Sequence, residues 1–89
     1  MDPFIKEIQQ INTVEAAIAK LQTQTEITPK LYEIINFIIE AHDGQYRKSG
    51  EPYCVHPILV ACITAHFSKD EAIIATALLH DGVADTPYC

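Results

Sequence analysis

The stretch AIIATALLH at residues 72–80 carries apolar side chains on nearly every side of an α-helix. A helix that is apolar all round is typical of the centre of a helical domain, where it packs against several neighbours. His80 and Asp81 stand where this apolar run ends, and Asp85 follows shortly after them. The sequence therefore predicts a buried helix whose end carries either a metal site or an ordinary polar cap.

Three further helices are predicted upstream, and no segment shows the alternation of apolar and polar residues that indicates a strand. Residues 3–21 repeat apolar residues at steps of three and four, which places them on one face of a helix. Thr28–Pro29 is typical of a helix start, and the helix that it opens runs to about His42. Pro57 opens another helix, which ends near Phe67.

The predicted fold class is all-α, a compact cluster of about four to five helices. Ser68 and Glu71 have the spacing of a capping box, which would open the helix that contains residues 72–80. The polar segment before Thr28 indicates a connection between helices. We therefore divide the chain into an N-terminal amphipathic helix with its connection, residues 1–27, and a helical domain, residues 28–89.

Length, charge and cysteine usage narrow the class of protein. The 89 residues are 48% hydrophobic, enough for one small folded domain, and carry a net charge of −6. This charge argues against general binding to nucleic acid or to an anionic membrane. No basic leader with an apolar core is present, and no apolar run approaches the roughly 20 residues that span a bilayer. Cys54, Cys62 and Cys89 form no close pair, so reduced thiols in a cytoplasmic protein are the simplest account.

Three potential metal ligands are expected to meet at one end of the helical cluster. His56 stands at the start of one helix, while His80 and Asp81 stand at the end of the next. Two consecutive antiparallel helices would bring these ends together. Imidazole and carboxylate groups suit Mn²⁺, Fe²⁺ or Zn²⁺. The alternative is that His80 contacts the last carbonyl groups of its own helix and that Asp81 is solvated.

Residues 43–55 break the helical periodicity and form a loop that contains a basic cluster. Arg47, Lys48 and Ser49 are consecutive in this otherwise acidic chain. An arginine offers phosphate a planar fork and can stack on a base, a lysine adds a point charge and a serine adds a hydroxyl. The sequence therefore indicates a pocket for a phosphorylated small molecule, and a solvated loop is the alternative.

The remaining histidines and cysteines are interpreted as structural. His42 is expected to cap or pack the end of its helix, and His66 is expected to face solvent. A zinc site made by Cys54, Cys62 and His56 is an alternative, although the spacing matches no usual zinc-finger pattern.

Two blocks of the sequence together resemble a known family. They are AHDGQYRKSGEPYCVHP at residues 41–57 and ATALLHDGVADT at residues 75–86. Both closely resemble the HD hydrolase domain of the RelA/SpoT family, the bacterial enzymes that hydrolyse, and in many members also synthesise, the alarmone (p)ppGpp. The resemblance covers roughly residues 28–87 and implies that residues 28–89 form a partial HD domain.

The resemblance implies a role for each candidate residue. His56, His80 and Asp81 match three of the family's metal ligands, usually for Mn²⁺. Arg47–Ser49 match the loop that holds the guanine nucleotide. Asp85 matches the second member of a Glu–Asp pair that helps to activate the attacking water. The implied reaction is hydrolysis of the 3′-diphosphate of (p)ppGpp in the stringent response.

Three departures from the family pattern predict little hydrolase activity. Ala84 stands where the family has the Glu of its Glu–Asp pair, and an alanine accepts no proton. Gly82 stands where the family usually has Val, and a glycine just after a helix end favours a left-handed cap. The family also supplies a further metal-ligating Asp downstream of the position that corresponds to Cys89. The predicted metal site is therefore incomplete.

Other functions stay open at the level of sequence. A non-catalytic module would use the basic loop to bind a guanine nucleotide, or would associate with another protein, without chemistry. A structural fragment would form a homodimer through exposed apolar helix faces. A different HD phosphohydrolase is disfavoured, because other HD proteins do not need the block RKSGEPY at residues 47–53.

Overall fold

The computed structural model describes the backbone of residues 3–84 and the side chains of residues 3–79. This part of the chain forms helices and no strand: α1 (Pro3–Gln9), α2 (Val14–Gln24), α3 (Pro29–Ala41), α4 (Val55–Phe67) and α5 (Glu71–Ala84). The Cα radius of gyration is 12.2 Å, close to the ~12 Å expected of a compact chain of this length. The all-α prediction is confirmed.

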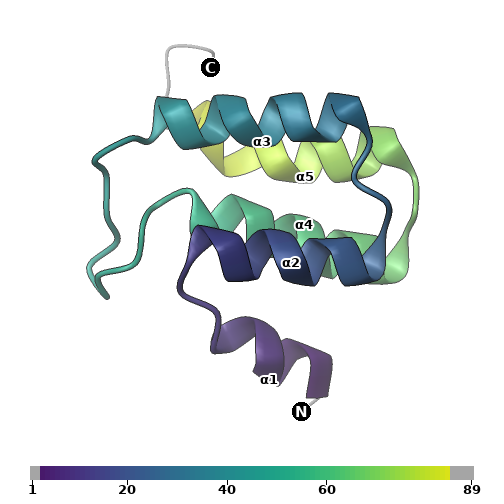
Figure 1. Cartoon of the computed structure of the whole chain (residues 1–89), viewed down its shortest axis with the longest axis horizontal. Coiled ribbons are helices and arrows are strands. Elements are labelled where there is room, and N and C mark those ends of the chain that lie inside the picture. The colour runs from purple at the N-terminus through teal and green to yellow at the C-terminus, as the bar shows by residue number, and fades with distance from the viewer. Residues whose placement is uncertain (1–2, 85–89) are drawn as a thin grey trace.

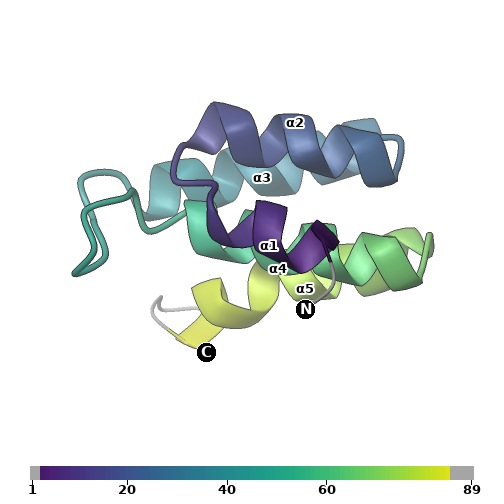
Figure 2. The same ribbon diagram turned by 90° about the horizontal axis from the view of Figure 1, so that it is seen from below.

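The helices pack side by side with α4 between two neighbours (Figures 1 and 2). α4 packs against α2 on one side and α5 on the other, and α5 also packs against α3. α1 lies outside this group, where Phe4 stacks on His66 of α4 with ring centroids 4.2 Å apart. Lys20 of α2 pairs with Glu7 of α1. The short first helix is therefore attached to both α2 and α4.

Each helix contributes side chains to one hydrophobic core. The large side chains that are almost completely buried include Leu21, Leu31, Ile35, Ile38, Ile58, Ile74 and Leu78. Burying one such side chain stabilises the folded state by about 1.5–3 kcal/mol relative to leaving it exposed. The predicted central helix, α5, contacts both α3 and α4, but its Ile73 is 50% exposed. α5 is therefore buried on two sides rather than all round.

The prediction of one helix over residues 3–21 is wrong, because the chain is interrupted between α1 and α2. Thr13 has an extended backbone, with φ −125° and ψ 154°, and its hydroxyl accepts a hydrogen bond of 3.2 Å from the N–H of Ala16. Threonine is a favoured N-cap because its hydroxyl replaces a missing helical acceptor. Both helices face the same core, so the apolar periodicity runs across the break and conceals it.

The predicted start of α3 is confirmed. The Thr28 hydroxyl accepts a hydrogen bond of 3.3 Å from the N–H of Leu31, and Pro29 occupies the first turn. α4 begins at Val55, earlier than the predicted start at Pro57. A proline is tolerated within the first turn of a helix, where the N–H groups have no intrahelical acceptor.

Both ends of α5 differ from the predictions. The Asp70 carboxylate accepts hydrogen bonds from the N–H groups of Ala72 and Ile73, at 2.8 and 3.3 Å, and so takes the capping role predicted for Ser68. A carboxylate is favoured there because it also interacts with the positive end of the helix dipole. α5 then continues through Gly82 to Ala84, so the predicted left-handed cap at Gly82 is wrong. A glycine weakens a helix by about 1 kcal/mol relative to alanine without ending it.

No helix within residues 3–84 is both long enough and apolar enough to cross a membrane.

Candidate functional site

The candidate residues gather at one end of the helical group. α3 and α5 end there, α4 begins there, and the loop between α3 and α4 extends from the same side (Figure 1). The predicted meeting of one helix start with the end of the next is confirmed for the backbone. His56 lies in the first turn of α4 and positions 80 and 81 lie near the end of α5. The side chains of His80 and Asp81, and the whole of Asp85, lie outside the described residues.

The loop between α3 and α4 is an ordered turn. Gly44 and Gly50 have φ angles of 78° and 102°, in the left-handed region that glycine adopts without strain. The N–H of Arg47 donates to the carbonyl of Glu51 at 2.9 Å, and the N–H of Gly50 donates to the carbonyl of Arg47 at 2.8 Å. These bonds hold residues 47–51 in a tight turn, with the basic cluster on the surface.

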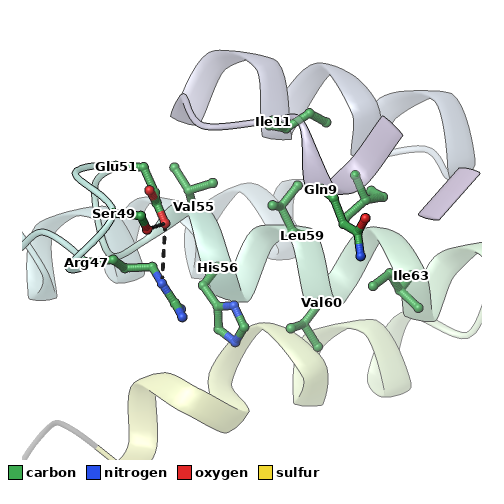
Figure 3. Close-up of a pocket in the computed structure, with 11 residues that line it drawn as sticks. Gln9, Ile11, Arg47, Ser49, Glu51, Val55, His56, Leu59, Val60 and Ile63 are labelled. Atoms are coloured by element: carbon green, nitrogen blue, oxygen red, sulfur yellow. Dashed lines mark hydrogen bonds and ion pairs between the residues drawn. The ribbon is translucent and has the colours of Figure 1, made fainter. Parts of the chain in front are cut away.

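Glu51 organises the polar side chains of this turn. The Ser49 hydroxyl donates a hydrogen bond of 2.7 Å to Oε1 of Glu51, and Nε of Arg47 lies 3.4 Å from the same oxygen (Figure 3). The hydrogen bond from Ser49 is the largest cause that lowers the pKa of Glu51 below its usual 4.5, and the nearby charges of Arg47 and His56 lower it further. Glu51 was not among the predicted site residues, although its position four residues after Arg47 is a recognisable signal of an ion pair.

A pocket of about 300 Å³ joins this turn to the face of α4 (Figure 3). Its polar lining consists of Gln9, Arg47, Ser49, Glu51 and His56, and its apolar lining consists of Ile8, Ile11, Val55, Leu59, Val60 and Ile63. The structure therefore brings Arg47 and Ser49 to the same space as His56. Lys48 is exposed and does not line this pocket. The wall supplied by α1 was not predicted, because helical periodicity does not show which loop a helix faces.

The cysteines do not contribute a metal site in the described part of the chain. Cys54 and Cys62 are buried free thiols, and Cys62 Sγ donates to the carbonyl of Ala17 at 3.5 Å. Burial raises the pKa of Cys54 and raises that of Cys62 to about 12. A thiol must lose its proton to bind a metal. Among the described side chains, no three His, Cys, Asp or Glu residues could hold a metal ion, so the alternative of a zinc site made by Cys54, Cys62 and His56 is wrong.

His66 is exposed, as was expected, and His42 caps the end of its helix, as was also expected. His66 is exposed on α4, and its Nδ1 lies 3.1 Å from Oε1 of Gln24. His42 is the C-cap of α3 and is buried, with Nδ1 2.7 Å from Oε1 of Gln45. The Nε2 atom of His42 has no hydrogen-bond partner among the described residues. An unpaired buried imidazole nitrogen at the end of the helices where α4 begins (Figure 1) fits a site for a divalent cation, because imidazole is a common ligand of such ions.

The family of the chain follows from a comparison with protein-family models. The HD domain model matches residues 35–88, which include both blocks of the motif. The chain belongs to the HD domain family. Membership of this hydrolase family implies a divalent metal, which agrees with the imidazole groups at this end of the helices.

Several curated proteins that are similar to this HD domain are named for the hydrolysis of (p)ppGpp. The guanosine-3′,5′-bis(diphosphate) 3′-pyrophosphohydrolase of Haemophilus influenzae is 53% identical over 49 residues, 55% of this chain and 7% of that enzyme. The bifunctional (p)ppGpp synthase/hydrolase SpoT of Escherichia coli is 54% identical over 48 residues, 54% of this chain and 7% of that enzyme. The predicted resemblance to the RelA/SpoT family is confirmed.

A longer alignment joins this HD domain to another relative. The guanosine-3′,5′-bis(diphosphate) 3′-pyrophosphohydrolase of Borreliella burgdorferi is 35% identical over 89 residues, which cover 92% of this chain and 13% of that enzyme. The HD domain thus spans only a small part of the length of these relatives. No solved structure matches it significantly.

Proposed function

We propose that this HD domain takes part in hydrolysis of the 3′-diphosphate of (p)ppGpp. The observation that carries the proposal is the pocket in which Arg47 and Ser49 line the same space as His56. It is supported by relatives whose names include this activity. In this proposal residues 28–89 form the HD domain, and residues 1–27 contribute α1, which forms one wall of the pocket. The protein is proposed to act in the cytoplasm.

In this proposal the basic turn binds the anionic substrate. The Arg47 guanidinium and the Ser49 hydroxyl bind phosphate oxygens inside the pocket, and Lys48 adds positive charge from the exposed side of the turn. The chain carries a net charge of −6 and would otherwise repel an anion. A local group of positive charge is therefore required for the substrate to approach.

The metal-binding role belongs to His56, His80 and Asp81, and the proposed metal is Mn²⁺. A bound divalent ion of this kind lowers the pKa of water and stabilises negative charge on phosphoryl oxygens. Asp85 accepts the proton of the attacking water as a general base. Ala84 supplies no second carboxylate beside Asp85, so we expect slow hydrolysis.

The proposal is tested by titrating Mn²⁺ and ppGpp into the purified chain by calorimetry, with product analysis on the same samples. We expect both to bind and pyrophosphate to be released slowly. Binding without any release would make the chain a non-catalytic nucleotide-binding module. Absence of nucleotide binding would contradict the proposal, and association of copies through apolar faces, read by sedimentation, would then be the next prediction to test.

A substitution at position 84 tests the proposed chemistry separately. Ala84→Glu restores the carboxylate that the family pattern has there, and we expect pyrophosphate release to increase by about tenfold or more. Ala84→Gln has nearly the same shape but accepts no proton at neutral pH, so it is the matched control. Equal rates for the two variants would show that a carboxylate at this position is not used.

A further inference from the structure

His42 carries a buried nitrogen that the rest of the described structure does not satisfy. The side chain is 3% exposed, and Nε2 has no hydrogen-bond partner among the described residues. An unpaired buried polar atom opposes folding, so native structures keep one mainly where a ligand, an ion or a water completes it. The histidine therefore needs an explanation beyond packing.

The other ring nitrogen of His42 determines what Nε2 can bind. Nδ1 lies 2.7 Å from Oε1 of Gln45. With this carbonyl oxygen as acceptor, Nδ1 is the donor, so Nε2 presents a lone pair in the neutral form of the ring. A histidine that donates one N–H to an oxygen and offers its other nitrogen has the usual arrangement of a metal-binding imidazole.

His42 also contacts both stems of the loop that carries the basic cluster, which are the segments just before and just after the turn at residues 47–51. Gln45 belongs to the first stem. Tyr53 belongs to the second stem, and its ring centroid lies 4.6 Å from that of His42. The N–H of Tyr53 donates to the carbonyl of Gln45 at 2.9 Å, and the N–H of His56 donates to the carbonyl of Tyr53 at 3.2 Å. One residue, Tyr53, thus connects His42 at the end of α3 with His56 at the start of α4.

We propose that His42 is a positioning residue of the HD site, which holds both stems of the basic loop and pairs its Nε2 lone pair with the hydrated divalent cation. The inference rests on the proposed function only in placing a cation at this end of the helices. It adds a fourth group to His56, His80 and Asp81, contributed by a different helix.

The first test reads the His42 ring directly in the ¹⁵N-labelled chain. Without metal, ring ¹⁵N spectra near neutral pH should show the proton on Nδ1. Substoichiometric Mn²⁺ should then broaden the His42 ring signals before those of His66, which lies near the opposite end of α4. A proton on Nε2, or His42 signals that stay sharp at high Mn²⁺ concentration, would overturn the proposal.

The second test uses a variant that separates the two ring nitrogens. His42→Asn keeps a hydrogen-bond donor near the Nδ1 position and removes Nε2. We expect the Tyr53 amide to stay protected from hydrogen exchange, while the affinity for Mn²⁺ falls about tenfold or more. His66→Asn is the matched control and should leave the affinity unchanged. Unchanged affinity in His42→Asn would overturn the proposal, and if this variant fails to fold, the ring spectra of the wild-type chain decide.

The two proposals fail in different ways. Broadening at His42 and weaker binding in His42→Asn, in a chain that does not act on ppGpp, would support this inference and contradict the proposed function. Pyrophosphate release with the same Mn²⁺ dependence in the wild-type chain and in His42→Asn would support the function and overturn the inference.

Discussion

At the scale of single residues, Glu51 prepares the basic turn for a ligand. Its Oε1 accepts the hydrogen bond from Ser49 and lies 3.4 Å from Nε of Arg47. Holding two side chains in advance reduces the conformational entropy that binding must remove. The carboxylate therefore contributes order to the site, although it repels the anion that the site is proposed to bind.

The ionisation of Glu51 gives a prediction about pH. Because its pKa is lowered in the folded chain, the contacts of the carboxylate are complete above the usual value of 4.5 and are lost as the pH falls through the lowered value. Ser49→Ala should move the pKa of Glu51 back toward 4.5, measured by NMR titration of the carboxyl carbon. Ser68→Ala, outside the turn, should have no effect on it. An unchanged pKa in Ser49→Ala would mean that Ser49 is not the main cause.

Arg47 and Lys48 are adjacent but should contribute unequally to nucleotide binding. Arg47 lines the pocket, and Lys48 does not. Loss of a charge-assisted hydrogen bond costs about 1.5–3 kcal/mol, or about tenfold to a hundredfold in affinity. Calorimetry should therefore show a loss of this size for ppGpp with Arg47→Ala, and a smaller, salt-dependent loss with Lys48→Ala. Equal losses would mean that the nucleotide binds on the exposed side of the turn.

At the scale of the elements, polar side chains determine where the helices begin. Thr13 divides the N-terminal amphipathic segment, Thr28 opens α3, and Asp70 opens α5. Each supplies an oxygen to N–H groups that have no intrahelical acceptor. The sequence identified Thr28, which is followed by a proline, but the spacing of Ser68 and Glu71 pointed to Ser68 as the cap of α5, whereas Asp70 takes that role.

The start of α5 provides a direct comparison of these two residues. Asp70→Ala should lower the free energy of unfolding by about 1 kcal/mol, because two N–H groups lose their acceptor. Ser68→Ala should lower it by less, since the Ser68 hydroxyl accepts one bond of 3.2 Å, from the N–H of Asp70. Urea unfolding of the two variants measures the difference. A larger loss of unfolding free energy for Ser68→Ala than for Asp70→Ala would support the capping box that the sequence predicted.

At the scale of the whole molecule, α4 connects the parts of the fold. It packs against α2 and α5, its first turn carries His56, and its outer face lines the pocket. Its side chain Ile58 is completely buried in the hydrophobic core. Packing in the core and geometry at the site are therefore linked through one element.

Two isoleucines test the importance of this packing with the same substitution. Ile58 is fully buried on α4, while Ile73 on α5 is 50% exposed. Ile58→Ala should lower the free energy of unfolding by about 2–5 kcal/mol, because it leaves a cavity in the core. Ile73→Ala should cost less than half as much. Denaturant unfolding checks both, and similar values for the two variants would contradict the described arrangement of α4 and α5.

The sequence by itself determined the all-α class, the start of α3, and the blocks that identify an HD domain. These features depend on periodicity and on hydrogen bonds between residues a few positions apart, so a reading along the chain detects them. The same reading joined α1 to α2, because both present apolar residues to one core.

The tertiary structure alone decided which side chains share a space. It placed α1 against the pocket and brought Arg47 and Ser49 to the same space as His56, while Lys48 stays outside. It also buried His42 with a ring nitrogen that has no partner among the described residues. Such relations depend on packing between helices that are distant in the sequence. Local hydrogen bonding and periodicity set where each helix lies along the chain, but the helices must be packed together before their neighbours are known.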